Sequence, residues 1–192
     1  MRTALVTGAT RGTGRALATA LADAGWHVHA LGRDRLVLDE LRASHGIVPM
    51  HADLTDRDQL RALTDEVEID VLVHAALRLP HPTRFSELSE SDIDMALEVN
   101  LSSTLHLSHA VLDGLAARRG DLVIALPEDS GLLPRTLAAA LTEFASGLAA
   151  EFPDVPRIHT LHCGPTPVIA ARRLTMMLAA NTPHDRTRIS TK

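Results

Sequence analysis

The chain of 192 residues has no tyrosine, one cysteine and one lysine, Lys192, so several kinds of chemistry lack the residues they need. A single thiol, Cys163, excludes a disulfide framework within the chain. No apolar run reaches the roughly 20 residues of a membrane span, and no charged segment leads into a signal-like apolar stretch. These absences predict a cytoplasmic protein with no membrane partner.

The sequence also lacks an excess of positive charge: the formal net charge is -5 at pH 7, with acidic and basic residues interspersed. The sequence therefore offers no basic face for nucleic acid or for an anionic membrane surface. It has 11 histidines, but no four-ligand set has the spacing of a zinc site, so we predict no metal site. With 45% hydrophobic residues the chain can bury one substantial core, and we expect a single domain over residues 1–192.

Apolar runs alternate with amphipathic segments along the sequence. The predicted strands cover residues 3–7, 27–32, 47–51, 70–75, 121–126 and 157–163. The predicted helices cover residues 13–24, 34–44, 56–65, 91–117, 134–152 and 168–180. This alternation predicts an α/β fold: a doubly wound parallel sheet with helices on both faces, which binds ligands at the carboxyl ends of its strands.

Residues that favour helix ends set the boundaries of these helices. The predicted N-caps are Asp34, Thr55 and Ser91, and the predicted stops are Gly25, Gly46 and Gly120. We expect residues 78–90 to form a surface loop at the ligand edge of the sheet. Residues 186–190 are expected to add a short edge strand or to form a frayed tail.

Residues 7–14 read TGATRGTG and connect the first predicted strand to the first predicted helix. At such a turn, backbone N–H groups and the positive end of the helix dipole can receive a pyrophosphate. The glycines allow a tight turn, close approach of phosphate and close packing of helix on strand. The alternative is a tight turn without a ligand. The expected contacts of a dinucleotide in this loop are Gly8, Thr10, Arg11, Gly12, Thr13 and Gly14.

These residues, with others further along the chain, resemble the short-chain dehydrogenase/reductase family over nearly the whole sequence. TGATRGTG is similar to the family's TGxxxGxG loop, Asp53-Leu54 to its acidic adenine contact, and Val99-Asn100-Leu101 to its helical asparagine motif. The resemblance implies a Rossmann-type sheet and an NAD or NADP cofactor, which His74, Ala75 and Gly164 would also contact. It further implies a dimer or tetramer formed through residues 91–117 and 134–152, and segment 136–150 is rich in small residues.

Two arginines favour NADP over NAD. Where an NAD-binding protein would place a carboxylate against the ribose 2′-hydroxyl, this chain has Gly32-Arg33-Asp34. Arg33 and Arg11 could each bind a 2′-phosphate, at about 1.5–3 kcal/mol per charge-assisted hydrogen bond. Asp34 argues mildly against this, unless it serves as the N-cap of the next helix. The alternative for both arginines is solvated surface charge.

The resemblance fails at the catalytic residues. The family's tyrosine, lysine and serine would fall at Pro134, Ala138 and the Pro127-Glu128 region. Asn100 alone is kept, and its implied role is partly structural, in a helix kink and a water-mediated proton relay. The stretch that covers the substrate in the family is almost absent after residue 163, which predicts a truncated covering region and an open pocket.

Other groups at the predicted strand ends could replace the missing acid. The candidates are His162, His74 and Glu128, whose alternatives are hydrogen-bonded structural histidines and a solvated turn. We therefore weigh two main functions. The first is an atypical NADP(H)-dependent oxidoreductase of small-molecule carbonyl or hydroxyl metabolism. The second is a catalytically silent NADP sensor or inactive partner subunit, with a fold repurposed for non-redox chemistry as a further alternative.

Overall fold

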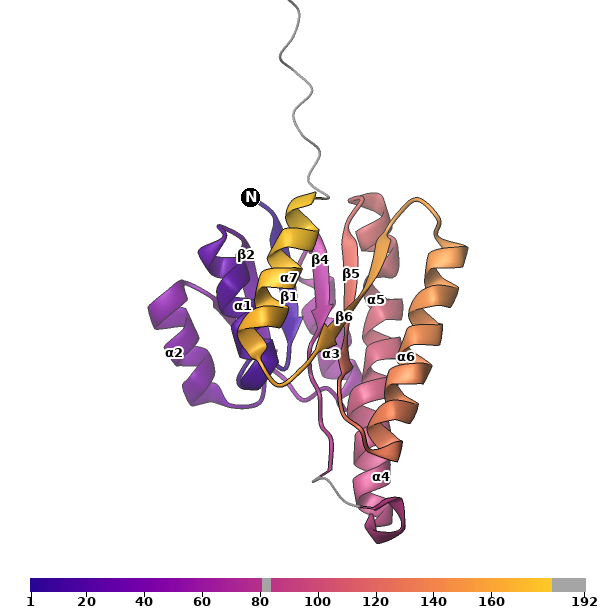
Figure 1. Cartoon of the computed structure of the whole chain (residues 1–192). Coiled ribbons are helices and arrows are strands. Elements are labelled where there is room, and N and C mark those ends of the chain that lie inside the picture. The colour runs from indigo at the N-terminus through magenta and orange to yellow at the C-terminus, as the bar shows by residue number, and fades with distance from the viewer. Residues whose placement is uncertain (81–83, 181–192) are drawn as a thin grey trace, which may run out of the picture.

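A computed structural model describes residues 1–80 and 84–180, and its centre is a six-stranded parallel sheet (Figure 1). The strand order is β3-β2-β1-β4-β5-β6. The strands are β1 (Thr3–Thr7), β2 (His27–Gly32), β3 (Val48–His51), β4 (Val71–His74), β5 (Asp121–Pro127) and β6 (Arg157–Cys163). The predicted doubly wound α/β sheet is confirmed. The order reverses between β1 and β4, which is where ligands of such sheets bind.

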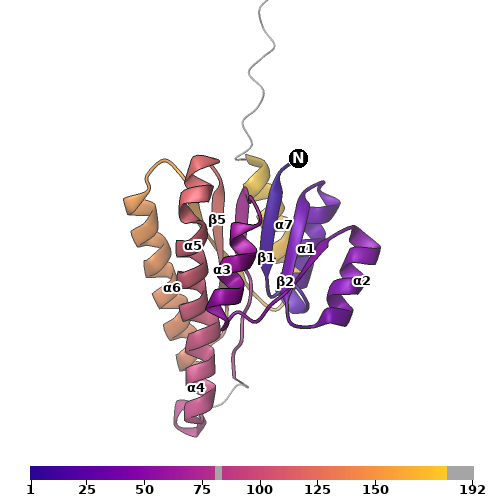
Figure 2. The same ribbon diagram turned by 180° about the vertical axis from the view of Figure 1, so that it is seen from behind.

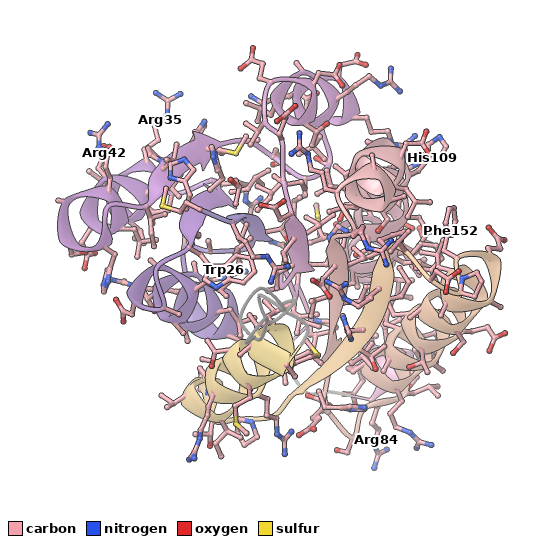
Figure 3. All side chains as sticks on the ribbon, turned by 90° about the horizontal axis from the view of Figure 1, so that it is seen from above. Trp26, Arg35, Arg42, Arg84, His109 and Phe152 are labelled. Atoms are coloured by element: carbon pink, nitrogen blue, oxygen red, sulfur yellow. The ribbon has the colours of Figure 1, made fainter. Side chains whose placement is uncertain are left out.

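Helices cover both faces of the sheet, as the two side views and the view from above show (Figures 1, 2 and 3). One apolar core joins the sheet to α1 (Gly12–Asp23), α2 (Arg35–His45) and α7 (Pro167–Ala180). A second core joins its other face to α3 (Arg57–Asp65), α5 (Ser103–Ala117) and α6 (Leu132–Glu151). None of the described helices is both long and apolar enough to cross a membrane.

Of the caps predicted for the second, third and fourth helices, two are confirmed and two are wrong. Asp34 caps α2 by accepting a hydrogen bond from the Val37 N–H at 3.2 Å, and Gly46 ends this helix with φ +65°. The predicted N-cap of α3, Thr55, instead donates its hydroxyl to Asp53, and Asp56 caps the helix. The next helix, α4 (Glu90–Leu97), is capped by Ser89 rather than by the predicted Ser91.

The predicted stop at Gly25 is confirmed, whereas Gly120 has another role. Ala24 ends α1, and Gly25 follows it with φ +85°. After α5 it is Arg119, with φ +54°, that takes the left-handed conformation. A Cβ atom at Gly120 would lie 2.4 Å from the carbonyl oxygen of Asp70, so this glycine permits close approach of two chain segments.

The predicted helix 91–117 contains a π-helical segment, η2 (Glu98–Ser102), between α4 and α5. The Ser103 N–H bonds the carbonyl oxygen of Glu98, and the hydroxyl groups of Ser103 and Thr104 donate to the next carbonyls. Such segments are rare and frequently lie at functional sites. Within the expected loop 78–90, Phe85–Glu87 forms a short 3₁₀ turn, η1. Residues 186–190 lie outside the described residues.

The first turn of α6 includes Pro134, because the helix begins at Leu132, two residues before its predicted start. Proline is tolerated there because the first N–H groups of a helix have no intrahelical partner. At the same edge of the sheet, α7 follows β6 after residues 164–166 alone. This short connection is the truncation that the sequence predicts for the covering region.

A buried ion cluster joins strands at the amino edge of the sheet. The fully buried carboxylate of Asp121 on β5 bonds Arg2 at 2.9 Å, Arg157 at 2.7 Å and His159 at 2.9 Å. Burial alone would raise the pKa of Asp121, but the hydrogen bonds from His159, Arg157 and Arg2 hold it well below its usual value. The cluster therefore connects the chain before β1 to β5 and β6.

Candidate functional site

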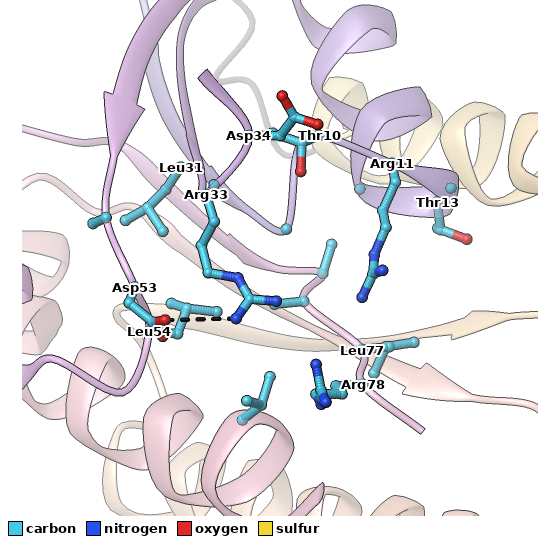
Figure 4. Close-up of a pocket in the computed structure, with 18 residues that line it drawn as sticks. Thr10, Arg11, Thr13, Leu31, Arg33, Asp34, Asp53, Leu54, Leu77 and Arg78 are labelled. Atoms are coloured by element: carbon cyan, nitrogen blue, oxygen red, sulfur yellow. Dashed lines mark ion pairs between the residues drawn. The ribbon is translucent and has the colours of Figure 1, made fainter. Parts of the chain in front are cut away.

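A cleft of about 570 Å³ opens at the carboxyl edge, where the strand order reverses between β1 and β4 (Figure 4). Its walls come from the glycine loop and from the segments after β2, β3 and β4. The lining residues are Gly8, Thr10, Arg11, Gly12, Thr13, Gly14, Leu31, Gly32, Arg33, Asp34, Ala52, Asp53, Leu54, Ala75, Ala76, Leu77, Arg78 and Val99. The cleft thus brings together most of the residues predicted to bind a dinucleotide.

The glycine loop is packed so tightly that side chains would not fit at two positions. A Cβ atom at Gly14 would lie 2.2 Å from the carbonyl oxygen of Gly8, and one at Gly8 would lie 2.6 Å from Cα of Ala76. Gly12 differs, because it has φ +51° and open space where a Cβ would be. This opening exposes the backbone at the start of α1, as the approach of a phosphate group requires.

Hydrogen bonds hold this loop against the neighbouring strands. The Thr7 hydroxyl accepts from the backbone N–H groups of Ala75 at 3.1 Å and Ala76 at 3.2 Å. On the other side, the Ala9 N–H donates to the carbonyl oxygen of Leu31 at 3.2 Å. Arg11, at the N-cap of α1, makes no side-chain capping bond, so no side chain of this N-cap competes with an anion. A dinucleotide phosphate fits this preformed cradle.

Three guanidinium groups extend toward the same part of the cleft, from Arg11, Arg33 and Arg78 (Figure 4). Among the described residues, only Arg33 of these three forms an ion pair, with Asp53 at 3.5 Å. Hydrogen bonds from Thr55 lower the pKa of Asp53 against the opposing effect of its burial, and Arg33 adds to this. The cleft is therefore lined by cationic groups, although it also contains carboxylates.

Asp34, whose carboxylate would repel a 2′-phosphate, has a structural role. Asp34 lines the cleft, but its side chain accepts the capping hydrogen bond from the Val37 N–H. The backbone of Arg33 is fixed by the hydrogen bond between its carbonyl oxygen and Nε2 of His51, at 3.1 Å. Asp34 is thus occupied at the start of α2 while Arg33 faces the cleft.

Asn100 is buried within η2 and holds the segment that follows β4. Its Oδ1 accepts from the Arg78 N–H at 3.0 Å, and its Nδ2 donates to the carbonyl oxygens of Arg78 and Ala96, each at 2.7 Å. Both amide hydrogens are therefore used. This placement makes Asn100 a positioning residue for the cleft wall rather than a group that reaches a ligand.

His74, predicted both as a catalytic acid and as a cofactor contact, lies outside the cleft lining. Its ring is buried against α5, with Nε2 3.1 Å from the hydroxyl oxygen of Ser108. Burial lowers the pKa of His74 to about 3. The ring is consequently neutral near pH 7 and is a poor source of protons, in contrast to the prediction.

The other predicted acids lie together at the ends of β5 and β6. Nδ1 of His162 is 3.8 Å from Oε1 of Glu128, and both side chains are partly exposed. Oε2 of Glu128 packs against Gly164, where a Cβ atom would lie only 2.5 Å away. Burial raises the pKa of the adjacent Cys163 thiol to about 11, so this thiol stays protonated. Neither this pair nor Gly164, a predicted cofactor contact, lines the cleft.

An apolar cluster occupies the start of α6, where the resemblance implies catalytic residues. Leu133 and Leu137 are buried against Ala96 of α4, and Pro134 is buried with them. Ala138 lies on the next turn of α6 and is partly exposed. The residues present therefore supply packing, and neither position carries a group that exchanges protons.

Of the cleft residues that follow β4, sequence reasoning identified Ala75 but missed the others. Of these, Ala76, Leu77 and Arg78 line the cleft beside the predicted Ala75, and Val99 of η2 lies opposite. A signal was available, because the ends of β1 and β4 are adjacent in a sheet whose order reverses there. Among the described residues, no group of three or more histidine, cysteine or acidic side chains could hold a metal ion.

A second groove, of about 1310 Å³, lies on the outer side of α4, η2 and α5. Apolar side chains there include Leu97, 40% exposed, and Leu105, 37% exposed. His106 and His109 of α5 line the same groove. This surface belongs to one of the two segments predicted to mediate self-association.

Comparisons with known proteins agree with this geometry. The sequence pattern of the family described as short chain dehydrogenase matches residues 2–153. A short-chain type dehydrogenase/reductase of Sinorhizobium fredii, itself uncharacterized, is 38% identical over 160 residues, covering 80% of this chain and 64% of that protein. L-xylulose reductase of Mus musculus is 39% identical over 120 residues, covering 61% of this chain and 48% of the reductase. The chain spans about half to two thirds of the length of these curated relatives.

Solved structures show the same fold. A short chain dehydrogenase/reductase family protein superimposes with a TM-score of 0.84 at 25% identity, covering 91% of this chain and 88% of that chain. A metagenomic short-chain oxidoreductase, solved in complex with NADP, gives a TM-score of 0.79 at 23% identity, covering 92% and 90% of the two chains. At such low identity, the second likeness supports the fold alone.

Proposed function

This chain belongs to the short-chain dehydrogenase/reductase family, and from that premise we propose that it binds NADP(H) and exchanges hydride with a small carbonyl or hydroxyl compound. The observation that carries the proposal is the cleft at the end of β1, where the glycine loop leaves its backbone open and the side chains of Arg11, from that loop, and Arg33 extend into the same space (Figure 4).

In this proposal different residues of the chain bind different parts of the cofactor. The backbone of Gly12, Thr13 and Gly14 holds the pyrophosphate at the start of α1, and Asp53 with Leu54 contacts the adenine. Arg33 and Arg11 bind the ribose 2′-phosphate through charge-assisted hydrogen bonds. Asp34 does not oppose this, because it caps α2.

When bound, the nicotinamide cofactor supplies the hydride. The proton that a carbonyl oxygen must gain during reduction comes from the Glu128–His162 pair, since His74 is buried and the chain has no tyrosine. A single general acid contributes about 10²–10⁴-fold to a rate, so turnover is expected to be slow compared with a complete relay.

A silent NADP-binding protein is the second candidate, and the start of α6 favours it. The buried Leu133, Pro134 and Leu137 leave no proton donor at the catalytic positions of the family. Such a protein would sense NADP(H) or serve as the inactive partner of a functional homologue. The same silent cleft is compatible with a fold repurposed for non-redox chemistry.

Titration of the purified protein with NADPH and NADH tests the binding proposal. We expect NADPH to bind more tightly, and Arg33→Ala to weaken NADPH binding about 10- to 100-fold while NADH binding changes little. Arg35→Ala, which removes an exposed charge on α2 outside the cleft lining, is the matched control. Tighter binding of NADH by the wild-type protein would refute the preference.

Single-turnover oxidation of NADPH with a panel of carbonyl compounds separates the two candidates. If the chain is an oxidoreductase, His162→Ala and Glu128→Gln slow the reaction at least tenfold without changing NADPH affinity. The absence of turnover with every substrate, together with tight NADPH binding, would favour the silent protein. Activity that is unchanged in both variants would exclude this pair as the proton source.

We also propose that two copies associate through the groove on α4, η2 and α5 and through α6. Exposed apolar side chains such as Leu97 and Leu105 line or flank this surface, and α6 presents small residues including Ala139 and Ser146 to solvent. Light scattering at micromolar concentration should report a dimer or tetramer, and Leu105→Glu should shift it toward the monomer. A wild-type monomer would contradict the proposal.

A further inference from the structure

The third arginine of the cleft, Arg78, has no role in the function proposed so far. It lies four residues beyond the end of β4, in the segment that lines the cleft next to the glycine loop. Its guanidinium extends toward the space that Arg11 and Arg33 also face (Figure 4). Among the described residues, no carboxylate lies within ion-pair distance of it, although its charge adds to the Ser89 hydrogen bonds that lower the pKa of Asp92.

The backbone of Arg78 is held unusually firmly for an exposed residue. The Asn100 side chain accepts from its N–H at 3.0 Å and donates to its carbonyl oxygen at 2.7 Å. Asn100 is itself 1% exposed and is anchored on the carbonyl oxygen of Ala96. A side chain built on such a fixed backbone loses less conformational entropy when it binds a ligand than one on a free loop.

The strand order indicates which part of a dinucleotide Arg78 would meet. Arg33 follows β2, on one side of β1, and Arg78 follows β4, on the other side. Ala76, two residues before Arg78, is packed against Gly8 at the start of the phosphate loop. Arg33 and Arg78 therefore flank the loop from opposite sides, so a 2′-phosphate at Arg33 leaves the pyrophosphate as the anion closest to Arg78.

We propose that Arg78 binds the pyrophosphate of the dinucleotide and that Asn100 positions it for this role. This inference rests on the proposed function, and it names a residue that clamps the cofactor from the β4 side of the loop. A guanidinium can form two parallel hydrogen bonds with a phosphate, which a lysine cannot reproduce. The contact is independent of the 2′-phosphate, so it should act equally on NADPH and NADH.

Fluorescence or calorimetric titration of the full chain with four probes tests the assignment. Arg78→Ala should weaken NADPH, NADH and ADP-ribose by the same factor, about 10- to 100-fold, and weaken 2′,5′-ADP less, because this probe carries only one of the two phosphates of the pyrophosphate. Arg78→Lys should give a smaller loss. Arg84→Ala is the control, because it removes an exposed arginine outside the cleft lining. This variant is expected to bind all four probes like the wild-type protein.

A second variant tests the positioning role of Asn100. Asn100→Ala should reproduce the common loss of NADPH and NADH affinity, and the double variant with Arg78→Ala should lose little more, because both substitutions remove one contact. Circular dichroism checks that this variant remains folded. A fully additive loss in the double variant would refute the positioning role.

The outcomes distinguish this assignment from the proposed function. If Arg78→Ala binds NADPH and ADP-ribose as the wild-type protein does, the assignment of Arg78 is wrong while NADP(H) binding stands. A loss confined to NADPH and 2′,5′-ADP would move Arg78 to the 2′-phosphate and would also overturn the assignment. A wild-type protein that binds neither NADPH nor ADP-ribose would overturn both proposals.

Discussion

The carboxyl edge of this sheet has two regions that differ in almost every chemical respect. At the ends of β1, β2 and β4, the chain places glycines without room for side chains, open backbone and three arginines around one cleft. At the ends of β5 and β6, it places a proline, a carboxylate–histidine pair and the apolar start of α6. Both regions belong to one continuous sheet.

The difference teaches that one sheet edge can combine a region fixed by backbone geometry with a region defined by side chains. The first region depends on backbone geometry, which substitutions such as Gly14→Ala would destroy. The second has no such constraint on its backbone, and the start of α6 packs there through Leu133 and Leu137. Four experiments test how separate the regions are.

The largest effect is expected at the opposite edge, where Asp121 connects the two regions. Asp121→Ala leaves Arg2, Arg157 and His159 without their shared partner and should lower the free energy of unfolding by about 3–5 kcal/mol. The unfolding transition measured by Trp26 fluorescence, which reports the β1–β2 region, should shift together with the transition measured by circular dichroism. If the Trp26 transition stayed unchanged, the regions would unfold separately. Asp113→Ala, on the exposed face of α5, is the control.

The next effect concerns the glycine loop alone. Gly14→Ala places a Cβ atom 2.2 Å from the carbonyl oxygen of Gly8, so the loop must shift and NADPH binding should be lost. Overpacking of this kind costs about 1–3 kcal/mol of stability. Gly147→Ala, in α6 with open space around it, should instead stabilise by about 0.5–1 kcal/mol and preserve binding. Calorimetry measures the NADPH affinity of both variants, and thermal unfolding measures their stability. If Gly14→Ala bound NADPH as tightly as the wild-type protein, the loop would have room for a side chain after all.

The buried His74 predicts a pH dependence of stability from the end of β4. Its pKa is depressed to about 3 in the folded chain, from 6.5 in the unfolded chain, so the unfolded state binds more protons between these values. Stability is therefore present above pH 6.5 and is lost as pH falls, by about 1.4 kcal/mol at pH 5.5. His74→Gln should remove this part of the slope in denaturant titrations. An identical slope in both proteins would contradict the buried neutral ring.

The smallest effect is expected from introducing the family's tyrosine and lysine at the two positions of α6 where the resemblance implies them. Pro134→Tyr combined with Ala138→Lys should change carbonyl reduction by less than about tenfold, below the usual contribution of a general acid. The reason is that Leu133 and Leu137 pack the start of α6 into an apolar cluster that holds Pro134 buried. A gain of 100-fold or more would show that only the two side chains separate this region from an active one.

The sequence predicted the sheet well because its signals are local. Alternating apolar runs marked all six strands, and Asp34 and Gly46 marked the ends of α2. Where several capping residues stand close together, the choice depends on geometry. Ser89 caps α4 because Asp92 completes a capping box with it, and Thr55 is drawn away by Asp53.

The cleft residues that a local backbone pattern defines were predicted from the sequence. The residues whose position depends on burial or on long-range contacts were missed. The glycine loop and Arg33 were identified from their positions directly after predicted strands, whereas the backbone of Arg78 is held by the amide of Asn100, 22 residues away. His74 looked like an acid because its position on the strand says nothing of how deeply Ser108 and α5 cover it. Depth and long-range partners are properties of the packed chain.

The π-helical segment Glu98–Ser102 sets a limit on how this chain can change length. A π-helical turn contains one residue more than the α-helical turn it replaces. Removing that residue would restore a regular helix in which α4 and α5 keep their faces, but the wide turn that carries Asn100 would be lost. Asn100 would then leave Arg78. A single-residue deletion in this segment is therefore expected to loosen the wall of the cleft even though the helices on either side keep their places.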